Sequence, residues 1–368
     1  MTEKKKTLTL PKKNFFYYSA SLPAILEKTK SSIVFSTYQA GKLIFISSKD
    51  GEILIKYAKN FARPMGIAFD PKTSRLAVAT KNQINVFGNS SALAQSFPEK
   101  PNHYDAMFMP QCRYYTGRVD THEIAFGEEG LWTVNTQFSA LTLMTDSQHF
   151  EVKWKPPFIG ELRPFDKCHL NGMAMKDGKP KYVSMFGEMD QPTEWRKSEK
   201  NHGLIMDVDT GEVLVRNLTM PHTPTLYEEK IYFLQSGTGQ IMYYDLKTKQ
   251  TVEVALLKSF LRGLEVIGDF LFVGASELRE QSTSFGKLPI SDQETFCGIY
   301  VYNRHTGQQV AGLSYTDLVK EIFSVKVLPG LQVAGILTEK DELYDKCITA
   351  GNGLNFWLKK SDQKEQEA

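Results

Sequence analysis

Hydrophobic and β-branched residues along the chain fall into short runs bounded by Gly, Asn, Asp, Ser and Pro. Runs of this kind predict strands, whereas a helical pattern is clear only over residues 22–30. One type of run ends in small or polar residues and occurs six times, at residues 33–37, 76–80, 131–135, 182–186, 231–235 and 271–275. The fold class predicted from this pattern is all-β.

The runs recur in a fixed order, which indicates an internal repeat. Each is associated with a shorter apolar segment that would form the inner strand of its unit, at residues 66–69, 123–126, 172–175, 225–227, 263–266 and 324–327. Units of roughly 40 to 55 residues with about four strands each are typical of a β-propeller. We therefore predict a six-bladed β-propeller built from four-stranded antiparallel blades.

The two ends of the repeat region predict how the ring closes. Segment 321–327 lacks a second strand after it, and segment 33–37 lacks an inner strand before it, so N- and C-terminal strands together would complete the sixth blade. Residues 1–30 are then an N-terminal extension with a short helix, 31–358 a single propeller domain, and 359–368 a disordered tail. Seven blades remain an alternative because residues 344–358 are hard to assign, and a stack of open sandwiches is the second-ranked architecture.

Composition narrows the classes of partner. The chain has 368 residues, 41% of them hydrophobic, so it can bury a sizeable core. Lys and Arg number 44 against 42 Asp and Glu, a balance that gives no reason to expect nucleic acid or an anionic membrane as partner. No apolar run approaches the ~20 residues of a membrane span. The basic residues 1–13 do not resemble a secretory signal, and the four cysteines form no Cys-x-x-Cys pair, so we expect a reduced, cytoplasmic protein.

Candidate chemistry comes from the residues that precede the inner strands, because the starts of these strands converge on the channel of a propeller. Around the ring these residues are Arg63, His122, His169, His222, Arg262 and Glu321. Three of the seven histidines of the chain thus occupy similar positions in consecutive blades. The register is imperfect, because His122 lies one residue before its strand and His169 three, an offset of roughly 6–7 Å along a strand.

Converging neutral imidazoles suit a divalent metal (Zn, Fe or Mn) with an open position for water or substrate. The alternative is that each histidine is a hydrogen-bonded residue of the channel wall. Arg63 and Arg262 would bind the carboxylate or phosphate of a small anionic substrate or peptide, or instead pair with acidic residues of neighbouring blades. Candidates for moving protons are Asp120, Glu123 and Tyr38.

Three long polar-aromatic stretches, residues 98–119, 187–203 and 276–296, are predicted to be loops around the same channel mouth. They supply Tyr104, Trp195, Arg196 and Arg279 as candidate substrate-binding residues, which Glu321 joins from the ring. Trp195 and the tyrosines could stack on a substrate or pack within a lid.

Several motifs resemble those of a bacterial family of uncharacterised proteins, described as conserved hypothetical or domain-of-unknown-function proteins and expected to be propellers. The resemblance spans residues 31–330 and is carried by Ser36-Thr-Tyr-Gln-Ala-Gly41, Arg63-Pro-Met-Gly66, Asp120-Thr-His-Glu123, Cys168-His-Leu-Asn-Gly172, Met220-Pro-His-Thr-Pro224, Phe285-Gly-Lys-Leu-Pro289 and Glu321-Ile-Phe323. It implies the propeller fold but no biochemical role.

The architecture is more distantly similar to six-bladed propeller enzymes. Among these, peptidyl-hydroxyglycine lyases hold zinc with three channel histidines near an arginine, and gluconolactonase-like proteins use acidic ligands. The set of His122, His169 and His222 is more similar to the first. The leading hypothesis is a metal-dependent lyase, hydrolase or isomerase acting on a small anionic substrate, and the alternative is a non-catalytic propeller that binds a protein or small ligand on its top face. The oligomeric state is left open.

Overall fold

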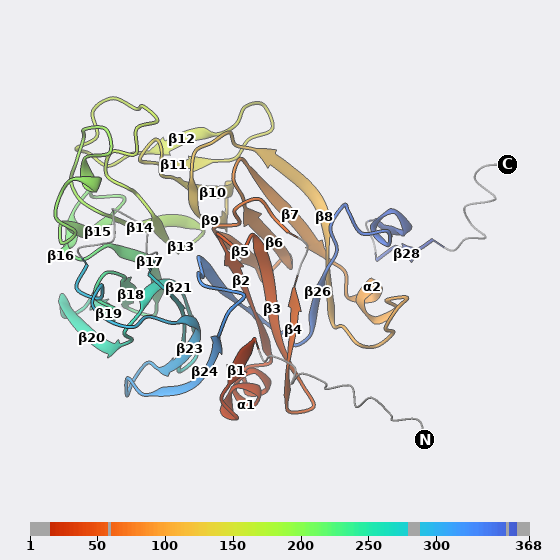
Figure 1. Cartoon of the computed structure of the whole chain (residues 1–368). Helices are drawn as coiled ribbons and strands as arrows, with labels where there is room; N and C mark the ends of the chain where they lie inside the picture. Colours follow the sequence, from red (N-terminus) through yellow and green to blue (C-terminus); the bar gives the residue numbers. More distant parts are fainter. Residues whose placement is uncertain (1–14, 58–59, 279–287, 351–352, 359–368) are drawn as a thin grey trace, which may run out of the picture.

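The computed structural model describes residues 15–57, 60–278, 288–350 and 353–358. Six four-stranded antiparallel sheets follow one another around a ring (Figure 1). From the inner to the outer strand, the first three blades are β25 (Ser324–Pro329), β2 (Ser31–Thr37), β3 (Lys42–Lys49) and β4 (Glu52–Tyr57); β5 (Ile67–Asp70), β6 (Arg75–Ala79), β7 (Gln83–Asn89) and β8 (Ala106–Tyr115); and β9 (Thr121–Gly127), β10 (Gly130–Asn135), β11 (Ala140–Leu143) and β12 (Glu151–Trp154).

The other three blades continue in chain order. They are β13 (Gly172–Lys176), β14 (Lys179–Met185), β15 (Gly203–Asp207) and β16 (Val213–Leu218); β17 (Pro221–Tyr227), β18 (Lys230–Gln235), β19 (Gln240–Asp245) and β20 (Gln250–Leu256); and β21 (Phe260–Ile267), β22 (Phe270–Ser276), β23 (Cys297–Asn303) and β24 (Gln309–Tyr315). The inner strands β5, β9, β13, β17, β21 and β25 contact one another in that order and back to β5. The protein is therefore a six-bladed β-propeller, as predicted.

Closure of the ring also follows the prediction. Strand β25 pairs antiparallel with β2, from Ser31 opposite Pro329 to Ser36 opposite Ser324, so the first blade combines both ends of the repeat region. Residues 344–358 do not add a seventh blade in the described part of the chain. They form η2 (Tyr344–Lys346) and a hairpin of β27 (Cys347–Thr349) and β28 (Asn355–Trp357), which packs on α2 (Ser91–Gln95).

Two outer strands carry a further strand that the sequence pattern did not reveal. Strand β1 (Phe16–Tyr18) pairs antiparallel with β24, and β26 (Ala334–Ile336) pairs parallel with β8. Both cover an edge whose backbone groups would otherwise be open to pairing with another chain. These segments are only three residues long, too short to show an alternating pattern.

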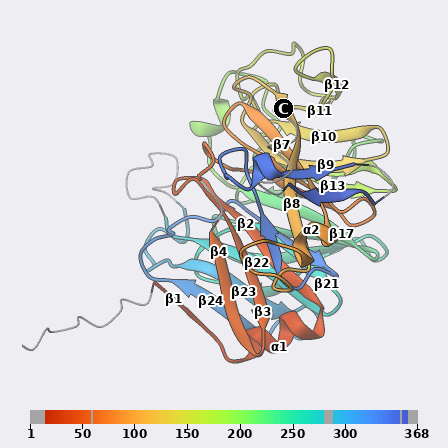
Figure 2. The ribbon, with the colours of Figure 1, turned by 90° about the vertical axis from the view of Figure 1, so that its right-hand side faces the viewer.

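The helix predicted at residues 22–30 is α1 (Ser21–Lys28). It lies against β3 and β24 beside the first blade (Figure 2). Its apolar face places Leu22 and Leu26 among side chains of two blades, including Phe35 and Leu313, and all four are almost fully buried. Helix α1 thus packs across the junction between the last blade and the first.

The prediction that residues 98–119 form a loop is wrong, because they contain the ten-residue strand β8. Pro110 sits where the register between β7 and β8 shifts, and proline in a sheet is tolerated at such a bulge. The residues that follow it are mostly exposed on both faces, so no alternation marked them as a strand. The second predicted loop, residues 187–203, carries a short helical turn, η1 (Glu194–Arg196).

Arg279 and the tail predicted at residues 359–368 lie outside the described residues. In the described part of the chain, no helix is long and apolar enough to span a membrane.

Candidate functional site

A cavity of about 140 Å3 lies at the channel mouth, where the inner strands begin. It is lined by Tyr38, Met65, Asp120, His122, Asp166, His169, Phe186, Trp195, Arg196, Met220, Arg262 and Phe323. Seven of these are residues that the sequence predicted: Tyr38, Asp120, His122, His169, Trp195, Arg196 and Arg262. The structure therefore brings together predicted residues from four blades and from the loop that carries η1.

The three histidines do not occupy equivalent positions. His122 and His222 match, because the residues before them, Thr121 and Pro221, pair with Asn135 and Gln235 at the ends of corresponding strands. His169 instead corresponds to the residues two places before His122 and His222, which are Asp120 and Met220, and all three have a positive φ. This is the two-residue offset already visible in the sequence.

The hydrogen bonds of His122 fix the position of its proton. The hydroxyl of Thr136 donates to the carbonyl of Leu170 in the next blade at 2.6 Å, and so uses its only proton. The Thr136 oxygen lies 2.8 Å from Nδ1 of His122, and the carbonyl oxygen of Asp120 lies 3.0 Å from the same nitrogen. Because both neighbours can only accept, Nδ1 carries the hydrogen, and Nε2 of the neutral ring carries the lone pair.

His222 repeats this arrangement two blades further along. The hydroxyl of Ser236 donates to the carbonyl of Leu261 at 2.6 Å and lies 2.7 Å from Nδ1 of His222, while the carbonyl of Met220 lies 3.0 Å from that nitrogen. His222 Nε2 therefore also carries a lone pair. This atom is buried and has no hydrogen-bond partner among the described residues.

Both rings are held in the neutral state. Burial lowers the pKa of His122 well below 6.5, and the neighbouring charges of His169 and Arg262 lower it further. For His222, burial comes first and Arg262 second as the cause of a similarly lowered pKa. At neutral pH the two Nε2 atoms are therefore acceptors or bases and not donors.

His169 is held by a carboxylate. Its Nδ1 lies 3.0 Å from Oδ1 of Asp166, which is almost fully buried. Asp166 also accepts from Nε1 of Trp195 at 3.0 Å and pairs with Arg196 at 3.5 Å, so it links the turn η1 to the histidine. The His169 ring is enclosed by aromatic rings, with centroid separations of 4.2 Å to Trp195 and 4.4 Å to Phe186.

Arg262 supplies a buried positive charge to the cavity wall. Its guanidinium pairs with Glu321 at 3.5 Å and lies against the rings of Phe323 (4.9 Å) and Phe260 (5.2 Å). Glu321 was predicted to contact substrate, but the structure places it behind Arg262 as its ionic partner. Arg196 is the second guanidinium at the cavity and stacks on Trp195 at 4.2 Å.

Two predicted residues lie beside this centre. Arg63 is exposed, has a positive φ of 50° and lies 5.6 Å from the ring of Tyr38, so it borders the cavity mouth without lining the cavity. Asp120 lines the cavity, and one of its oxygens accepts a hydrogen bond from Gln137 at 2.9 Å.

Glu123, predicted as a proton carrier, lies deeper in the channel. Its carboxylate accepts a hydrogen bond from the backbone N–H of Met173 at 3.0 Å, an inner-strand group that has no sheet partner on that side. Burial raises its pKa to about 7, although Lys326 opposes this. Lys326 pairs with Glu265 at 2.9 Å, and both line a separate cavity of about 300 Å3 at the far end of the channel.

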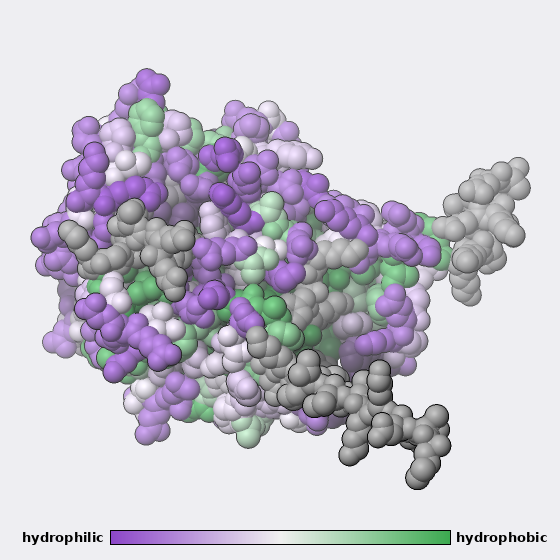
Figure 3. Space-filling model, viewed as in Figure 1, coloured by the Kyte–Doolittle hydropathy of each residue, from purple (hydrophilic) through white to green (hydrophobic). Residues whose placement is uncertain are grey.

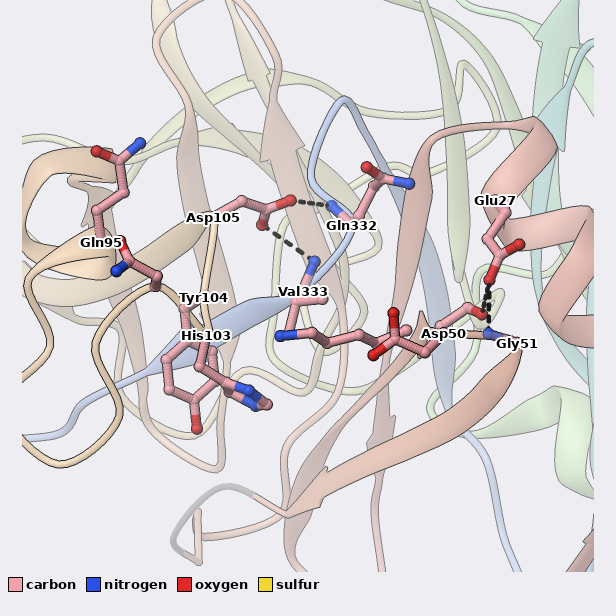
Figure 4. A pocket seen from close by; sticks show the side chains of 12 residues that line it. Glu27, Asp50, Gly51, Gln95, His103, Tyr104, Asp105, Gln332 and Val333 are labelled. Atoms are coloured by element: carbon pink, nitrogen blue, oxygen red, sulfur yellow. Dashed lines mark hydrogen bonds between the residues drawn. The ribbon is translucent and has the colours of Figure 1, made fainter.

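Tyr104 does not belong to the channel mouth, because the stretch that contains it leads into the outer strand β8. It lines a cavity of about 750 Å3 between α1, the β3–β4 turn and residues 332–333 (Figure 4). The carboxylates of this cavity bind backbone groups: Glu27 accepts from Gly51, and Asp105 from Gln332 and Val333. These bonds join loops at the outside of the ring.

Comparison with known proteins places the chain in a family. A profile described as "Domain of unknown function (DUF4915)" matches residues 20–337, which includes strands of all six blades. The chain belongs to the DUF4915 family. No curated protein matches the sequence significantly.

Solved structures similar to this DUF4915 chain share its fold. A chain from the crystal structure of a nidogen/laminin complex has 10% sequence identity and a TM-score of 0.53, covering 82% of this chain and 99% of that one. A protein of unknown function from Bacteroides caccae has 11% identity and a TM-score of 0.50, covering 81% and 98%. At these identities the likeness concerns the fold alone.

The metal site expected from sequence stays a prediction for this DUF4915 chain. Among the described residues, no group of three or more His, Cys, Asp or Glu side chains is placed so that it could hold a metal ion. His122 and His169 are close, with ring centroids 4.9 Å apart, but His222 does not line the cavity. Its ring contacts are instead with Phe186 and Phe260.

Sequence reasoning missed several residues of the DUF4915 site: Met65, Asp166, Phe186, Met220 and Phe323. Asp166 could have been found, since it precedes His169 by three residues and an acid so close to an imidazole suits orientation of the ring. Thr136 and Ser236 directly follow the second strands, and only the structure shows that they bind the histidines.

Proposed function

We propose that the protein is an enzyme of the lyase, hydrolase or isomerase type, which takes a small anionic molecule into the channel mouth and uses His122 as a general base. The observation that carries this proposal is the fixed tautomer of His122, whose Nε2 lone pair belongs to a cavity-lining ring. A base with a pKa below the ambient pH is unprotonated and ready to accept a proton.

Two guanidinium groups at the cavity are the evidence that the substrate is an anion. Arg262 and Arg196 both line the cavity, and each pairs with its own carboxylate only at 3.5 Å. Charge-assisted hydrogen bonds between such groups are usually about 2.7–2.9 Å long, so both ion pairs are longer than usual. Guanidinium groups bind carboxylates and phosphates through two parallel hydrogen bonds.

A thermal-shift screen of small carboxylates and phosphates tests whether the cavity binds an anion. A ligand at 100 times its Kd is expected to stabilise the protein by about 2.7 kcal/mol. The matched variant is R262M/E321Q, which removes the guanidinium without leaving its buried carboxylate unpaired. Equal stabilisation of the parent and this variant, or no stabilising anion at all, would contradict the proposal.

The catalytic part is tested with His122→Asn. The Asn side chain amide takes the position of Nδ1 and can still donate to Thr136, but it has no atom at the position of Nε2. We expect this variant to bind the anion and to lose turnover by about 100-fold or more, as general-base catalysis contributes 10²–10⁴-fold. Retained turnover would assign the base to another residue.

A metal-dependent form of the same function is the second candidate. Histidines that bind metals through Nε2 usually donate Nδ1–H to an oxygen, and His122, His169 and His222 all have oxygen atoms next to Nδ1. A Zn, Fe or Mn ion on His122 and His169 would then act as Lewis acid toward the anion. Metal analysis of untagged protein decides between the two forms: about one ion per chain, lost in His169→Ala, favours the metal.

The third candidate function is that of a non-catalytic propeller, which binds a protein or small ligand on its top face. The nidogen/laminin neighbour supports it only as an example of a similar fold in a protein complex. In the view of Figure 3 the surface is mostly hydrophilic, and hydrophobic residues occur in small groups between the hydrophilic ones. A cavity lined by two guanidinium groups and two histidines favours a small-molecule ligand.

A further inference from the structure

We propose that the anion bound at the channel mouth also carries a hydroxyl or amino group, and that this group donates a hydrogen bond to Nε2 of His222. The inference rests on the proposed function, since it names the class of ligand for the same site: 2-hydroxy acids, amino acids or phosphate esters with a neighbouring hydroxyl.

Nε2 of His222 can accept a hydrogen bond, and no donor to it is present among the described residues. Its proton lies on Nδ1, where the oxygens of Ser236 and Met220 receive it. Only 4% of the residue is exposed, and Nε2 has no partner among the described residues. Buried polar atoms in folded proteins are nearly always paired, so an unpaired one calls for an explanation such as a missing ligand.

The position of His222 connects it to the cavity. Phe186 lies in the cavity wall, and its ring is 5.3 Å from that of His222. Met220 lines the same wall and is bonded through its carbonyl to the histidine. Arg262 also lines the cavity and is close enough to His222 to lower its pKa. The ring of His222 therefore lies directly behind residues of the cavity wall.

One side chain of the cavity wall, that of Met220, can change its conformation. Met220 is an unbranched side chain with several rotatable bonds, so it can move aside at little cost, whereas the ring of Phe186 is fixed between those of His169 and Trp195. Displacement of the Met220 side chain would open the cavity toward His222. The geometry then provides a guanidinium for the anionic group and two histidine acceptors, His222 and His122, for donors on the adjacent carbon atoms.

Isothermal titration with matched pairs of compounds tests the inference. The pairs are lactate and propionate, malate and succinate, and glycerol 3-phosphate and propyl phosphate, which differ only by hydroxyl groups. We expect the hydroxylated member of at least one pair to bind about tenfold or more tightly than its partner. In His222→Asn, which keeps a donor toward Ser236 and lacks an atom at Nε2, we expect this preference to disappear.

The control variant is Ser236→Ala. It removes the hydroxyl that links two blades, but the carbonyl of Met220 still accepts from Nδ1, so the preference for the hydroxyl should remain despite a lower melting temperature. Equal binding of both members of every pair, or a preference that survives His222→Asn, overturns this inference and leaves the proposed function intact. If no compound binds, the result contradicts both this inference and the proposed function.

Discussion

The two ends of the channel use buried ionisable groups in different ways. At the mouth, His122 and His222 each give their Nδ1–H to protein oxygens, and the buried Nε2 of His222 has no hydrogen-bond partner in the described part of the chain. At the far end, Lys326 pairs with Glu265 at 2.9 Å, and the charge of Glu123 also acts on Lys326. Burial lowers the pKa of the histidines, whereas it raises that of Glu123.

This difference teaches how to separate a site from a structural cluster in the same channel. Groups that pair with one another have no capacity left for a ligand, even when a cavity of about 300 Å3 adjoins them. Groups that are oriented by the protein, but keep one atom unpaired toward a cavity, have that capacity. By this criterion we propose that the mouth is the functional site and that the cluster at the far end stabilises the ring.

The largest expected effect comes from removing the cation at the far end. Lys326→Met removes the ionic partner of Glu265 and the positive charge that acts on Glu123, and breaking such a pair should lower the free energy of unfolding by about 4 kcal/mol at pH 8. At pH 6 the loss should be smaller, because Glu123 is then protonated. Urea unfolding at both pH values measures this.

The matched control is Lys320→Met, which breaks a surface pair with Glu277 at 3.3 Å. It should lower stability by less than about 1 kcal/mol at either pH. Similar losses in the two variants would show that the cluster at the far end is not a structural element.

The second prediction concerns pH. The pKa of Glu123 rises from 4.5 in the unfolded chain to about 7 in the fold, so its contribution to stability is complete below pH 4.5 and is lost as the pH rises toward 7. The difference in unfolding free energy between the parent and Glu123→Gln should therefore change by up to about 3 kcal/mol over this range. A difference that does not change with pH would place the titration elsewhere.

For His122 and His222 we expect stability to change with pH in the opposite direction. Their pKa values are lowered in the fold, so the stability they contribute is present above pH 6.5 and is lost as the pH falls below it. The double variant His122→Asn/His222→Asn should therefore be less sensitive to acid than the parent between pH 6.5 and 5. Unfolding curves across this range in the Glu123→Gln background isolate the two histidines.

The third prediction concerns the carboxylate that joins η1 to the site. Asp166→Asn places an amide donor against the donors of His169 and Trp195, so we expect a loss of about 2 kcal/mol. Faster hydrogen exchange should be confined to the turn η1 and the residues next to it. If exchange rises evenly over all blades, Asp166 stabilises the whole ring and does not hold the turn in particular.

The smallest effect on stability and on anion binding is expected at Arg63, which borders the cavity mouth. Arg63→Ala removes an exposed guanidinium that contacts the ring of Tyr38, which should lower stability by no more than about 1 kcal/mol. Its effect on anion binding should be much weaker than that of R262M/E321Q, because Arg63 does not line the cavity. A larger effect of Arg63 on affinity would move the anion toward the rim.

The fold could be predicted well because each blade repeats the same local pattern. The runs at residues 231–235 and 271–275 became β18 and β22 with shifts of no more than one residue. Strand β8 was missed because Pro110 and the exposed residues after it break the alternation. Strands β1 and β26 were missed because three residues carry too little pattern.

The site could be predicted only as a set of residues around one axis. Arg262, His122 and His169 follow from their places before or within the inner strands, because propeller geometry brings these places together. Their roles do not follow, because His122 and His222 occupy matching positions and yet only His122 lines the cavity. Tyr104 was assigned to the mouth through a loop that is in fact the approach to a strand.

By itself the sequence favoured six blades over seven, closed the ring with both termini and placed a ring of polar residues at the channel mouth. These depend on local periodicity and on the symmetry of a repeat. Only the tertiary structure decided which nitrogen of His122 and His222 keeps a lone pair, because the deciding hydroxyls and carbonyls belong to Thr136 and Leu170 in one case and Ser236 and Leu261 in the other. Contacts between neighbouring blades are set by packing, which the order of residues along one blade does not encode.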